Sequence, residues 1–326
     1  MSAKCATPEG TARYRQRFTD RLAPTHFHEQ HGLVLSSIGI GTYLGNADEA
    51  TDVSYTRSIV RAVQLGVNVI DSAANYRFQR SERSIGQALQ QLVNEHGIAR
   101  EELVICTKGG YLPFDSVPPR NVRDYVNETF VKPGIASFED IVAGSHCMTP
   151  SYLQSQLDQS LRNMRIECVD VYYIHNPESQ LQYVSEQEFY DRLKLAFERL
   201  EENRQSGKLA HYGVATWNGF RTPPNSGQHH SLARMVELAR EVGGEQHGFH
   251  FIQLPFNVAM PEGLDVIEEA ERLGVTVVAS ASLLQGRIPP QTAIELARSI
   301  PGITTALIGM SRVEHVEENL ATDLHG

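Results

Sequence analysis

The sequence lacks the features that mark exported, membrane-spanning and nucleic-acid-binding proteins. Its 326 residues contain no apolar run as long as the ~18 residues of a membrane span. The first residues, MSAKCATPEGTARYRQRF, have no apolar centre of the kind that a secretory signal needs. Lys and Arg form no run, and the net charge of −10 argues against a phosphate backbone as a partner. We therefore predict a cytoplasmic protein without a membrane or nucleic-acid partner.

Cysteine is also scarce, and its spacing excludes the common metal and redox motifs. Cys5, Cys106, Cys147 and Cys168 show no CxxC spacing, and Cys106 and Cys168 lie in or beside apolar strands. This pattern favours reduced thiols over disulfides. Histidines bunch in HFHEQH, GQHH and HGFH, but no cysteine or carboxylate completes a recognisable metal spacing beside them. We predict no metal site and interpret these histidines as surface residues.

Short β-branched runs alternate with amphipathic stretches along the chain, and no linker or composition shift divides it. The expected strands are Leu35–Gly41, Val67–Asp71, Leu103–Thr107, Val169–His175, Ala210–Ala215, Phe251–Leu254, Val275–Ser280 and Thr305–Ile308. The expected helices are Tyr55–Leu65, Ser81–Asn94, Pro150–Met164, Glu188–Gln205, Leu232–Val242, Gly263–Leu273, Thr292–Ile300 and Val313–Ala321. Strands that alternate with helices predict a parallel sheet with right-handed crossovers. Eight such units favour one α/β domain, a closed (β/α)₈ TIM barrel over residues 33–326.

Two segments interrupt this rhythm. Residues 1–32 form a polar N-terminal extension, and residues 109–149 form an insertion after the third strand that is rich in Pro, Gly and aromatics. Long loops at the end of a strand are usually lids or substrate walls. We therefore expect the insertion to form one wall of a substrate site.

The stretch GIGTYLG resembles the GxGxxG dinucleotide fingerprint but has one residue too many before its third glycine. No acidic residue closes a second strand at the expected distance. The sequence therefore disfavours a Rossmann domain.

Three successive expected strands end in ionisable residues. Asp71 closes NVID, Lys108 follows VICT and His175 closes VDVYYIH, while Tyr76 comes five residues after Asp71. The carboxyl ends of barrel strands meet at one rim, where the chemistry of such barrels is found. We predict that these four side chains lie together at that rim.

The four residues together could deliver a proton to one oxygen atom. An ammonium ~4 Å from a hydroxyl contributes roughly 4 kcal/mol at an effective dielectric of 20, so we expect Lys108 to lower the pKa of Tyr76 from ~10 by up to ~3 units. Asp71 would keep the lysine charged, and His175 would donate a hydrogen bond to a substrate oxygen. No Ser or Cys nucleophile motif or metal triad is evident. The relay therefore predicts reduction of a carbonyl by an external hydride donor.

From Leu35 onward the chain resembles the aldo-keto reductase superfamily. The motifs that carry the resemblance appear in the family's order: GIGT, NVIDSAANYRFQRSERSIGQAL, CTKGG, DVYYIHNPE, HYGVATW, IQLPFN and ALIGMSRVEHVEENL. The resemblance implies an NADP(H)-dependent oxidoreductase that reduces an aldehyde or ketone, or oxidises the corresponding alcohol or sugar, by hydride transfer. It assigns Tyr76 as the general acid, Lys108 and Asp71 as the residues that tune it, and His175 as the residue that orients the carbonyl.

The resemblance also implies which residues contact an extended cofactor across the barrel mouth, where Asp71 borders the nicotinamide. Near the nicotinamide, the ribose and the pyrophosphate these are Gly41, Thr42, Tyr43, Gln253, Ser282, Leu283, Gln285, Gly286 and Arg287. Around the adenosine they are Gly309, Met310, Ser311, Arg312, His315, Glu318 and Asn319. A helix N-terminus, which binds anions well, begins at this last group.

Three departures from the family pattern affect the cofactor site. Ala215-Thr216 replaces the usual Ser-Asn, so the carboxamide contacts could fall to Thr216 or Asn218. Ser280 stands where an aromatic ring usually stacks on the nicotinamide. Ser311 replaces the usual basic residue at the 2′-phosphate, with Arg312 beside it. NADP remains the expected cofactor, with NAD as the alternative.

Other interpretations of the same residues stay open. Asp71 and Lys108 could be a buried ion pair that serves the fold, His175 a satisfied core histidine, and Trp217 either a substrate wall or plain packing. Two rival functions are a cofactor-binding regulatory relative with little turnover and a Schiff-base lyase that uses Lys108. The physiological substrate and the oligomeric state are not evident from the sequence.

Overall fold

Eight parallel strands form a closed barrel in the order β10-β3-β4-β5-β6-β7-β8-β9. The computed structural model describes residues 4–284 and 287–320. The barrel strands are β3 (Ile38–Gly41), β4 (Val69–Asp71), β5 (Val104–Gly109), β6 (Val169–His175), β7 (Leu209–Ala215), β8 (Phe249–Pro255), β9 (Thr276–Ser280) and β10 (Ile303–Gly309). This architecture confirms the predicted (β/α)₈ barrel.

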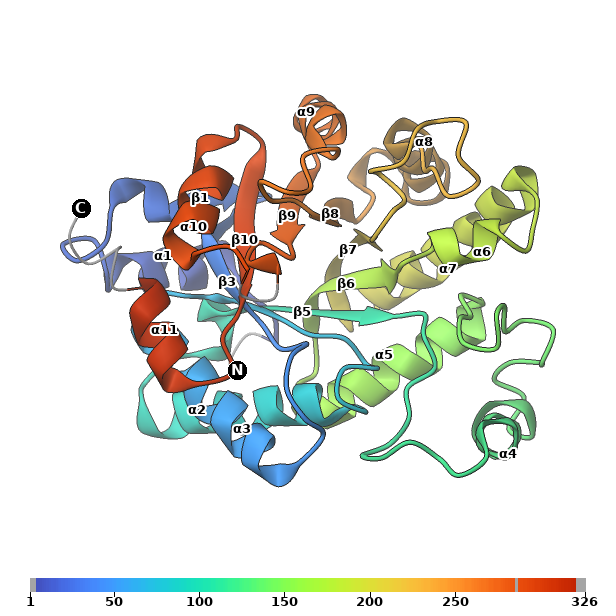
Figure 1. Cartoon of the computed structure of the whole chain (residues 1–326), viewed down its shortest axis with the longest axis horizontal. Helices are drawn as coiled ribbons and strands as arrows, with labels where there is room; N and C mark the ends of the chain where they lie inside the picture. Colours follow the sequence, from blue (N-terminus) through green and yellow to red (C-terminus); the bar gives the residue numbers. More distant parts are fainter. Residues whose placement is uncertain (1–3, 285–286, 321–326) are drawn as a thin grey trace.

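Helices surround the barrel on its outside (Figure 1). The helices that connect the barrel strands or follow the last one are α2 (Glu49–Gln64), α3 (Arg80–Glu95), α5 (Pro150–Met164), α7 (Glu186–Gln205), α8 (Leu232–Gly243), α9 (Leu264–Leu273), α10 (Pro290–Ser299) and α11 (Val313–Leu320). Several begin at a side-chain cap, as where Asp48 accepts the Thr51 N–H at 2.8 Å and Ser185 accepts that of Glu188 at 3.2 Å. No helix within the described residues is long and apolar enough to cross a membrane.

The first expected strand is divided in two. The stretch Leu35–Gly41 contains the end of β2 (Leu33–Ser36) and all of β3, with Ser37 between them. β2 pairs antiparallel with β1 (Phe27–Gln30) rather than joining the barrel sheet. The amide of Asn68 fixes this break, because its oxygen accepts the Ser36 N–H at 2.8 Å and its nitrogen donates to the Val34 carbonyl at 2.8 Å.

The N-terminal segment packs against the barrel. Its helix α1 (Pro8–Gln16) buries Tyr14, whose hydroxyl donates to the Val63 carbonyl at 2.5 Å. A 3-10 turn, η1 (Pro24–His26), leads into β1. Two arginines of this segment, Arg13 and Arg17, contact the buried carboxylate of Glu102.

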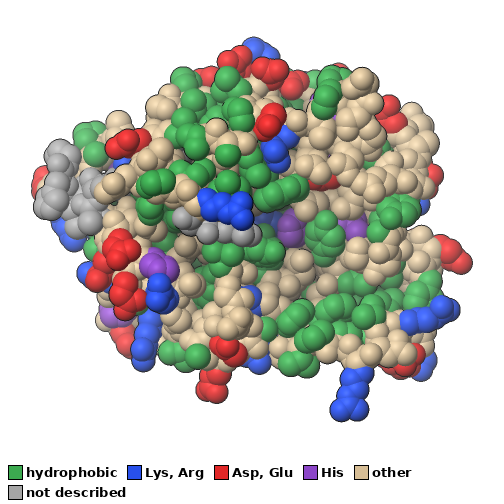
Figure 2. All heavy atoms as spheres, viewed as in Figure 1, with side chains coloured by type: hydrophobic (Ala, Val, Ile, Leu, Met, Phe, Trp, Pro, Cys, Tyr) green, Lys and Arg blue, Asp and Glu red, His purple; other side chains and the backbone are tan. Residues whose placement is uncertain are grey.

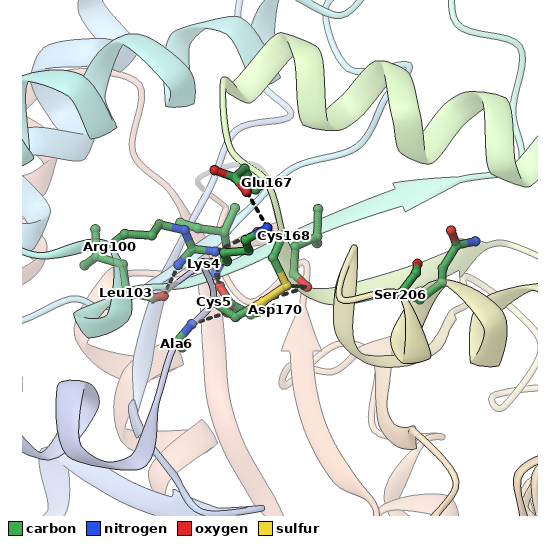
Figure 3. Close-up of a disulfide and its surroundings, with 12 residues drawn as sticks. Lys4, Cys5, Ala6, Arg100, Leu103, Glu167, Cys168, Asp170 and Ser206 are labelled. Atoms are coloured by element: carbon green, nitrogen blue, oxygen red, sulfur yellow. Dashed lines mark hydrogen bonds and ion pairs between the residues drawn. A yellow bond between two sulfur atoms is a disulfide. The ribbon is translucent and has the colours of Figure 1, made fainter. Parts of the chain in front are cut away.

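A disulfide joins Cys5 to Cys168, with 5.4 Å between the two Cα atoms. Cys168 directly precedes β6, and the neighbouring Ala6 N–H donates to Asp170 at 2.6 Å (Figure 3). The expectation of reduced thiols is therefore wrong for this pair. The sequence could not show it, because the two cysteines are 163 residues apart. Cys106 and Cys147 are free and buried.

The interpretation of the clustered histidines as surface residues is wrong for several of them. His26 and His230 are buried. His31, from the turn between β1 and β2, stacks on His250 of β8 at 4.2 Å, and His250 Nδ1 lies 2.9 Å from His211 Nδ1 of β7. Burial lowers the pKa of His211 to about 4 and that of His250 to about 3, so both rings are neutral at neutral pH.

The insertion after β5 is a compact unit with its own apolar cluster. It contains α4 (Val122–Val126) and a π-helical turn, η3 (Asn127–Val131). In Figure 1 it lies at the lower right, beyond the tip of β5. The cluster consists of Leu112, Val126, Phe130, Ala136 and Cys147 of the insertion together with Tyr152 of α5. The remaining short elements are α6 (Glu178–Leu181), η2 (Arg100–Glu102) and η4 (Gly244–Gln246).

Candidate active site

Asp71 and Lys108 form a buried ion pair at the carboxyl ends of two neighbouring strands. Lys108 Nζ lies 2.5 Å from Asp71 Oδ2 and donates to the Ser72 carbonyl at 2.7 Å. The other carboxylate oxygen of Asp71 accepts the Gln253 amide N–H at 2.9 Å from across the barrel. Burial lowers the pKa of Lys108, but its charge interactions and hydrogen bonds with Asp71 and Tyr76 together outweigh this effect, and the net pKa lies above the ordinary value. The lysine is therefore charged, as expected.

Tyr76 is held above this pair by an unusual turn. Arg77, Phe78 and Gln79 have positive φ angles of 49°, 56° and 68°. Arg77 fixes the turn, because its guanidinium donates to the Asn46 carbonyl at 2.8 Å and pairs with Asp52. The Lys108 ammonium lies 4.9 Å from the centroid of the Tyr76 ring. The backbone that directly follows Tyr76 is therefore strained at residues 77–79.

The net pKa shift of Tyr76 is opposite to the one expected. Burial raises the pKa of its hydroxyl, and the Lys108 ammonium lowers it only in part, so the net pKa lies above 10. The expectation of a lowered value was wrong because it counted the lysine charge without the cost of burying a phenolate. Tyr76 is consequently a protonated donor at neutral pH.

His175 faces Tyr76 across the floor of the site, with 5.8 Å between the two ring centroids. Burial lowers the pKa of His175 well below its ordinary value, and the charge of Lys108 lowers it further. The backbone carbonyl of His175 accepts the Nε2–H of His146 at 2.8 Å, since Gln180 donates to His146 Nδ1 at 2.9 Å. Because its pKa is lowered, the imidazole of His175 is neutral at neutral pH and can donate a hydrogen bond.

These side chains lie at the floor of a cavity of about 710 Å³ at the barrel mouth. Figure 2 shows histidine atoms within a hollow on this face of the molecule, with hydrophobic side chains around it. Tyr76, His175 and Asp71 line the cavity, as does Trp217 from the loop after β7. Lys108 lies beneath them and is 1% exposed. The four predicted catalytic residues thus come together as expected.

Most of the predicted cofactor contacts line the same cavity. They are Gly41, Thr42, Tyr43, Asp71, Thr216, Gln253, Ser280, Ser282, Leu283, Arg287, Gly309, Ser311, His315, Glu318 and Asn319. Gln285 and Gly286 lie outside the described residues.

Three of the predicted contacts lie off the cavity wall. Met310 is fully buried in the core. Asn218 turns its amide toward Gln228, to which it donates at 3.0 Å. Arg312 is exposed and donates to His315 Nε2 at 2.6 Å. The cavity is lined by His315 and not by Arg312 itself. Of the two residues considered for the carboxamide, Thr216 lines the cavity and Asn218 does not.

Sequence reasoning missed several lining residues, among them Asn176, Leu44 and Ile288. Asn176 could have been found, because it directly follows His175 at a strand end and precedes a proline. Leu44 and Ile288 gave no such signal, since an apolar residue in a loop is usually plain packing.

The sequence model of the Aldo/keto reductase family matches residues 37–295. The chain belongs to this family. Membership makes it an NAD(P)H-dependent oxidoreductase, which confirms the enzyme class expected from the sequence. The expected nicotinamide cofactor is confirmed with it.

Individual relatives of this aldo/keto reductase are distant. A Schizosaccharomyces pombe protein named "Putative voltage-gated potassium channel subunit beta" is 24% identical, over 93% of this chain and 89% of its own. The NADH-specific methylglyoxal reductase of Escherichia coli is 26% identical over 56% of this chain. The L-glyceraldehyde 3-phosphate reductase of the same species is 26% identical over 64%. The matched regions span about half the length of these two reductases.

Solved structures of the family share the fold. Glycerol dehydrogenase from Gluconobacter oxydans superposes with a TM-score of 0.65 at 18% identity, over 93% of this chain and 91% of the other. An aldo/keto reductase from Klebsiella pneumoniae, solved in complex with NADP and acetate, superposes with a TM-score of 0.58 at 18% identity. That match covers 89% of this chain and 86% of the other.

Proposed function

We propose that the chain reduces an aldehyde or ketone with NADPH, or oxidises the corresponding alcohol or sugar, and that Tyr76 is the general acid. The observation that carries this proposal is the grouping of Tyr76, His175 and the Asp71–Lys108 pair at the floor of one large cavity. NADPH, when bound, supplies the hydride. The chain's own residues then have to bind the carbonyl oxygen, orient it and protonate it.

The neutral His175 and the protonated Tyr76 converge on the same oxygen. His175 donates a hydrogen bond that fixes the direction of the carbonyl, and the hydroxyl of Tyr76 gives its proton to the oxygen as negative charge develops there. The Lys108 ammonium stabilises the tyrosinate left behind, because opposite charges attract strongly in a buried site. Asp71 keeps that ammonium charged and, through Gln253, in a fixed position.

The residues around the cavity fit a nicotinamide cofactor. Among the described residues, Thr216 Oγ1 and Ser282 Oγ are buried polar atoms without a hydrogen-bond partner, and both residues line the cavity. A buried hydroxyl without a partner costs stability, so both are suited to a polar ligand. We propose that Gln253 and Thr216 hold the carboxamide, and that Arg312 with His315 holds the 2′-phosphate. The second pair favours NADPH over NADH.

A cofactor-binding regulatory role is the second candidate function. The relative named as a channel subunit aligns over 89% of its own length, which keeps a regulatory role, in which this chain binds cofactor with little turnover, as the alternative. The intact Tyr76, Lys108 and His175 favour catalysis. A Schiff-base role for Lys108 is disfavoured, because its ammonium is fully engaged with Asp71, Ser72 and Tyr76.

The test is a panel of aldehydes, ketones and sugars, each assayed with NADPH and with NADH. We expect NADPH oxidation with some carbonyls, and a loss of at least ~100-fold in turnover for Tyr76→Phe with NADPH affinity kept. Tyr183→Phe is the control, because Tyr183 is exposed and is not among the residues that line the cavity. A Tyr76→Phe enzyme of normal rate would remove this residue from the mechanism. Tight NADPH binding without turnover on any substrate would favour the regulatory role.

A further inference from the structure

Trp217 is the chain's single tryptophan, and it lies in the long loop between β7 and α8. It lines the active-site cavity and is 47% exposed. It stands two residues beyond Ala215, whose register partner on β6 is His175. The indole is therefore a wall of the cavity close to the carbonyl-orienting histidine.

The backbone at Trp217 is held by one buried carboxylate. Glu178 Oε1 accepts the N–H groups of Trp217 at 2.7 Å, Asn218 at 2.9 Å and Gly219 at 3.4 Å. Glu178 is 4% exposed and follows His175 by three residues. A carboxylate that accepts several N–H groups is a strong and directional anchor.

The second oxygen of Glu178 faces the far end of the same loop. His230 Nε2 lies 3.5 Å from Glu178 Oε2, and the His230 ring stacks on Phe189 at 5.0 Å. The backbone N–H of His230 also donates to the Gly219 carbonyl at 2.7 Å. Gly219 permits this contact, because a Cβ there would come within 2.2 Å of the His230 ring. Glu178 thus contacts both ends of residues 217–230.

The fold alone does not require this arrangement at the mouth. The barrel strands are already paired through β6 and β7, from Val169↔Leu209 to His175↔Ala215. Glu201 shows what a purely structural buried carboxylate looks like in this chain: it accepts the Gly248 N–H at 2.6 Å and pairs with Arg204, beside the start of β8. Glu178 differs because the backbone that it holds carries a cavity wall.

We propose that Glu178, together with His230, is a positioning residue that fixes the Trp217 indole as a specificity-determining wall of the substrate site. The indole presents an apolar, aromatic face, which fits the ring or chain substituent of a carbonyl substrate rather than its oxygen. Carbonyls with an aryl substituent reach this wall, and carbonyls of two or three carbons do not. The substrate part of this inference rests on the proposed reductase function.

The experiment uses Trp217 as its own reporter in the full-length protein. Glu178→Gln and Glu178→Ala are compared with the wild type by Trp emission and by acrylamide quenching, with Glu201→Gln as the matched control. We expect both Glu178 variants to shift emission and expose the indole to acrylamide. We expect Glu201→Gln to leave the indole unchanged even where it lowers the melting temperature by a similar amount.

The second readout is a split between substrates. We expect Glu178→Gln to raise KM for benzaldehyde about 10-fold, the low end of what a lost pocket contact costs. KM for propanal and NADPH affinity should stay within about twofold. Trp217→Ala should show the same split, since it removes the wall that Glu178 holds.

The outcomes separate this inference from the proposed function. Unchanged emission, unchanged quenching and an unchanged benzaldehyde-to-propanal ratio in both Glu178 variants would make Glu178 merely structural and overturn the proposal. If the wild type reduces no carbonyl, the proposed function fails, yet the emission and quenching arms still decide whether Glu178 positions Trp217.

Discussion

Burial and the charge of Lys108 act in opposite directions on the pKa of Tyr76 and in the same direction on that of His175. Asp71 and His175 each end a strand and Lys108 is the last residue but one of β5, so the barrel brings them to one rim. Whether the pKa of Tyr76 rises or falls depends on how deeply its hydroxyl is buried relative to Lys108. That depth comes from the turn at residues 77–79, whose positive φ angles no propensity predicts.

The pH dependence of the reaction follows from these pKa directions. His175 has a pKa well below 6.5 and Tyr76 one above 10, so the neutral imidazole and the protonated hydroxyl coexist between those values. We expect kcat/KM for carbonyl reduction to be flat from about pH 6.5 to 9 and to fall only above about pH 10, where Tyr76 loses its proton. Initial rates at low substrate concentration measure this. An inflection near pH 6.5 that disappears in His175→Asn would contradict it.

The choice between NADPH and NADH is a second property of single residues. A charge-assisted bond from Arg312 to the 2′-phosphate is worth roughly 1.5–3 kcal/mol. Arg312→Ala should therefore weaken NADPH binding about 10- to 150-fold and leave NADH nearly unchanged, as measured by fluorescence titration. Arg234→Ala, which removes an exposed arginine on α8, is the control. Equal losses for both cofactors would place Arg312 away from the phosphate.

At the scale of elements, strongly periodic segments were predicted well and exceptional ones were not. Val169–His175 and Pro150–Met164 were predicted to the residue, because β-branched alternation and an N-terminal proline mark them. The break at Ser37 was missed, since it depends on the Asn68 amide, which binds Ser36 from 32 residues away in the chain. The insertion was recognised, but its packing was not predictable from composition.

None of residues 109–149, all of which the structure describes, lines the cavity, but Tyr111 near the start of the insertion contacts two residues that do. The Tyr111 ring lies 5.1 Å from the rings of both His175 and His146, and its hydroxyl accepts from Asn176 at 3.3 Å. Phe114 instead packs on Phe78 and on Tyr125 within the insertion. We therefore propose that Tyr111 acts on the substrate site by positioning His175 and Asn176, both of which line the cavity, and that the rest of the insertion contributes little.

Matched alanine variants test this division of the insertion. Tyr111→Ala should change relative kcat/KM across the carbonyl panel by about 10-fold or more and leave NADPH affinity within about twofold. Phe114→Ala should lower stability by less than the roughly 3 kcal/mol of a fully buried aromatic truncation, because Phe114 is only partly buried, and should not change substrate preference. Urea unfolding and the carbonyl panel provide the two measurements. A similar substrate profile for both variants would mean that Tyr111 lies away from the bound carbonyl.

For the molecule as a whole, the two ends of the barrel have separate tasks. The carboxyl ends of the strands hold the cavity, while the N-terminal segment packs around the opposite ends through the β1–β2 hairpin, α1 and the Cys5–Cys168 disulfide. This separation is typical of TIM barrels, in which the amino ends of the strands serve stability.

A disulfide is unusual in a reducing cytosol. Trapping the thiols of freshly lysed cells with an alkylating reagent would therefore test the proposed cytoplasmic location.

The disulfide should stabilise the whole fold without affecting the active site. It closes a loop of 163 residues, and bonds of this kind contribute about 2–5 kcal/mol by restricting the unfolded chain. We expect reduction, or Cys5→Ser, to lower the melting temperature by roughly 4–10 °C and to leave NADPH affinity within about twofold, because Cys168 precedes β6 at the end opposite the cavity. Calorimetry with and without reductant measures the shift. Cys147→Ser is the control, since Cys147 is free and its variant should remain sensitive to reductant. A Cys5→Ser protein that melts like the oxidised wild type would show that the tether adds nothing to stability.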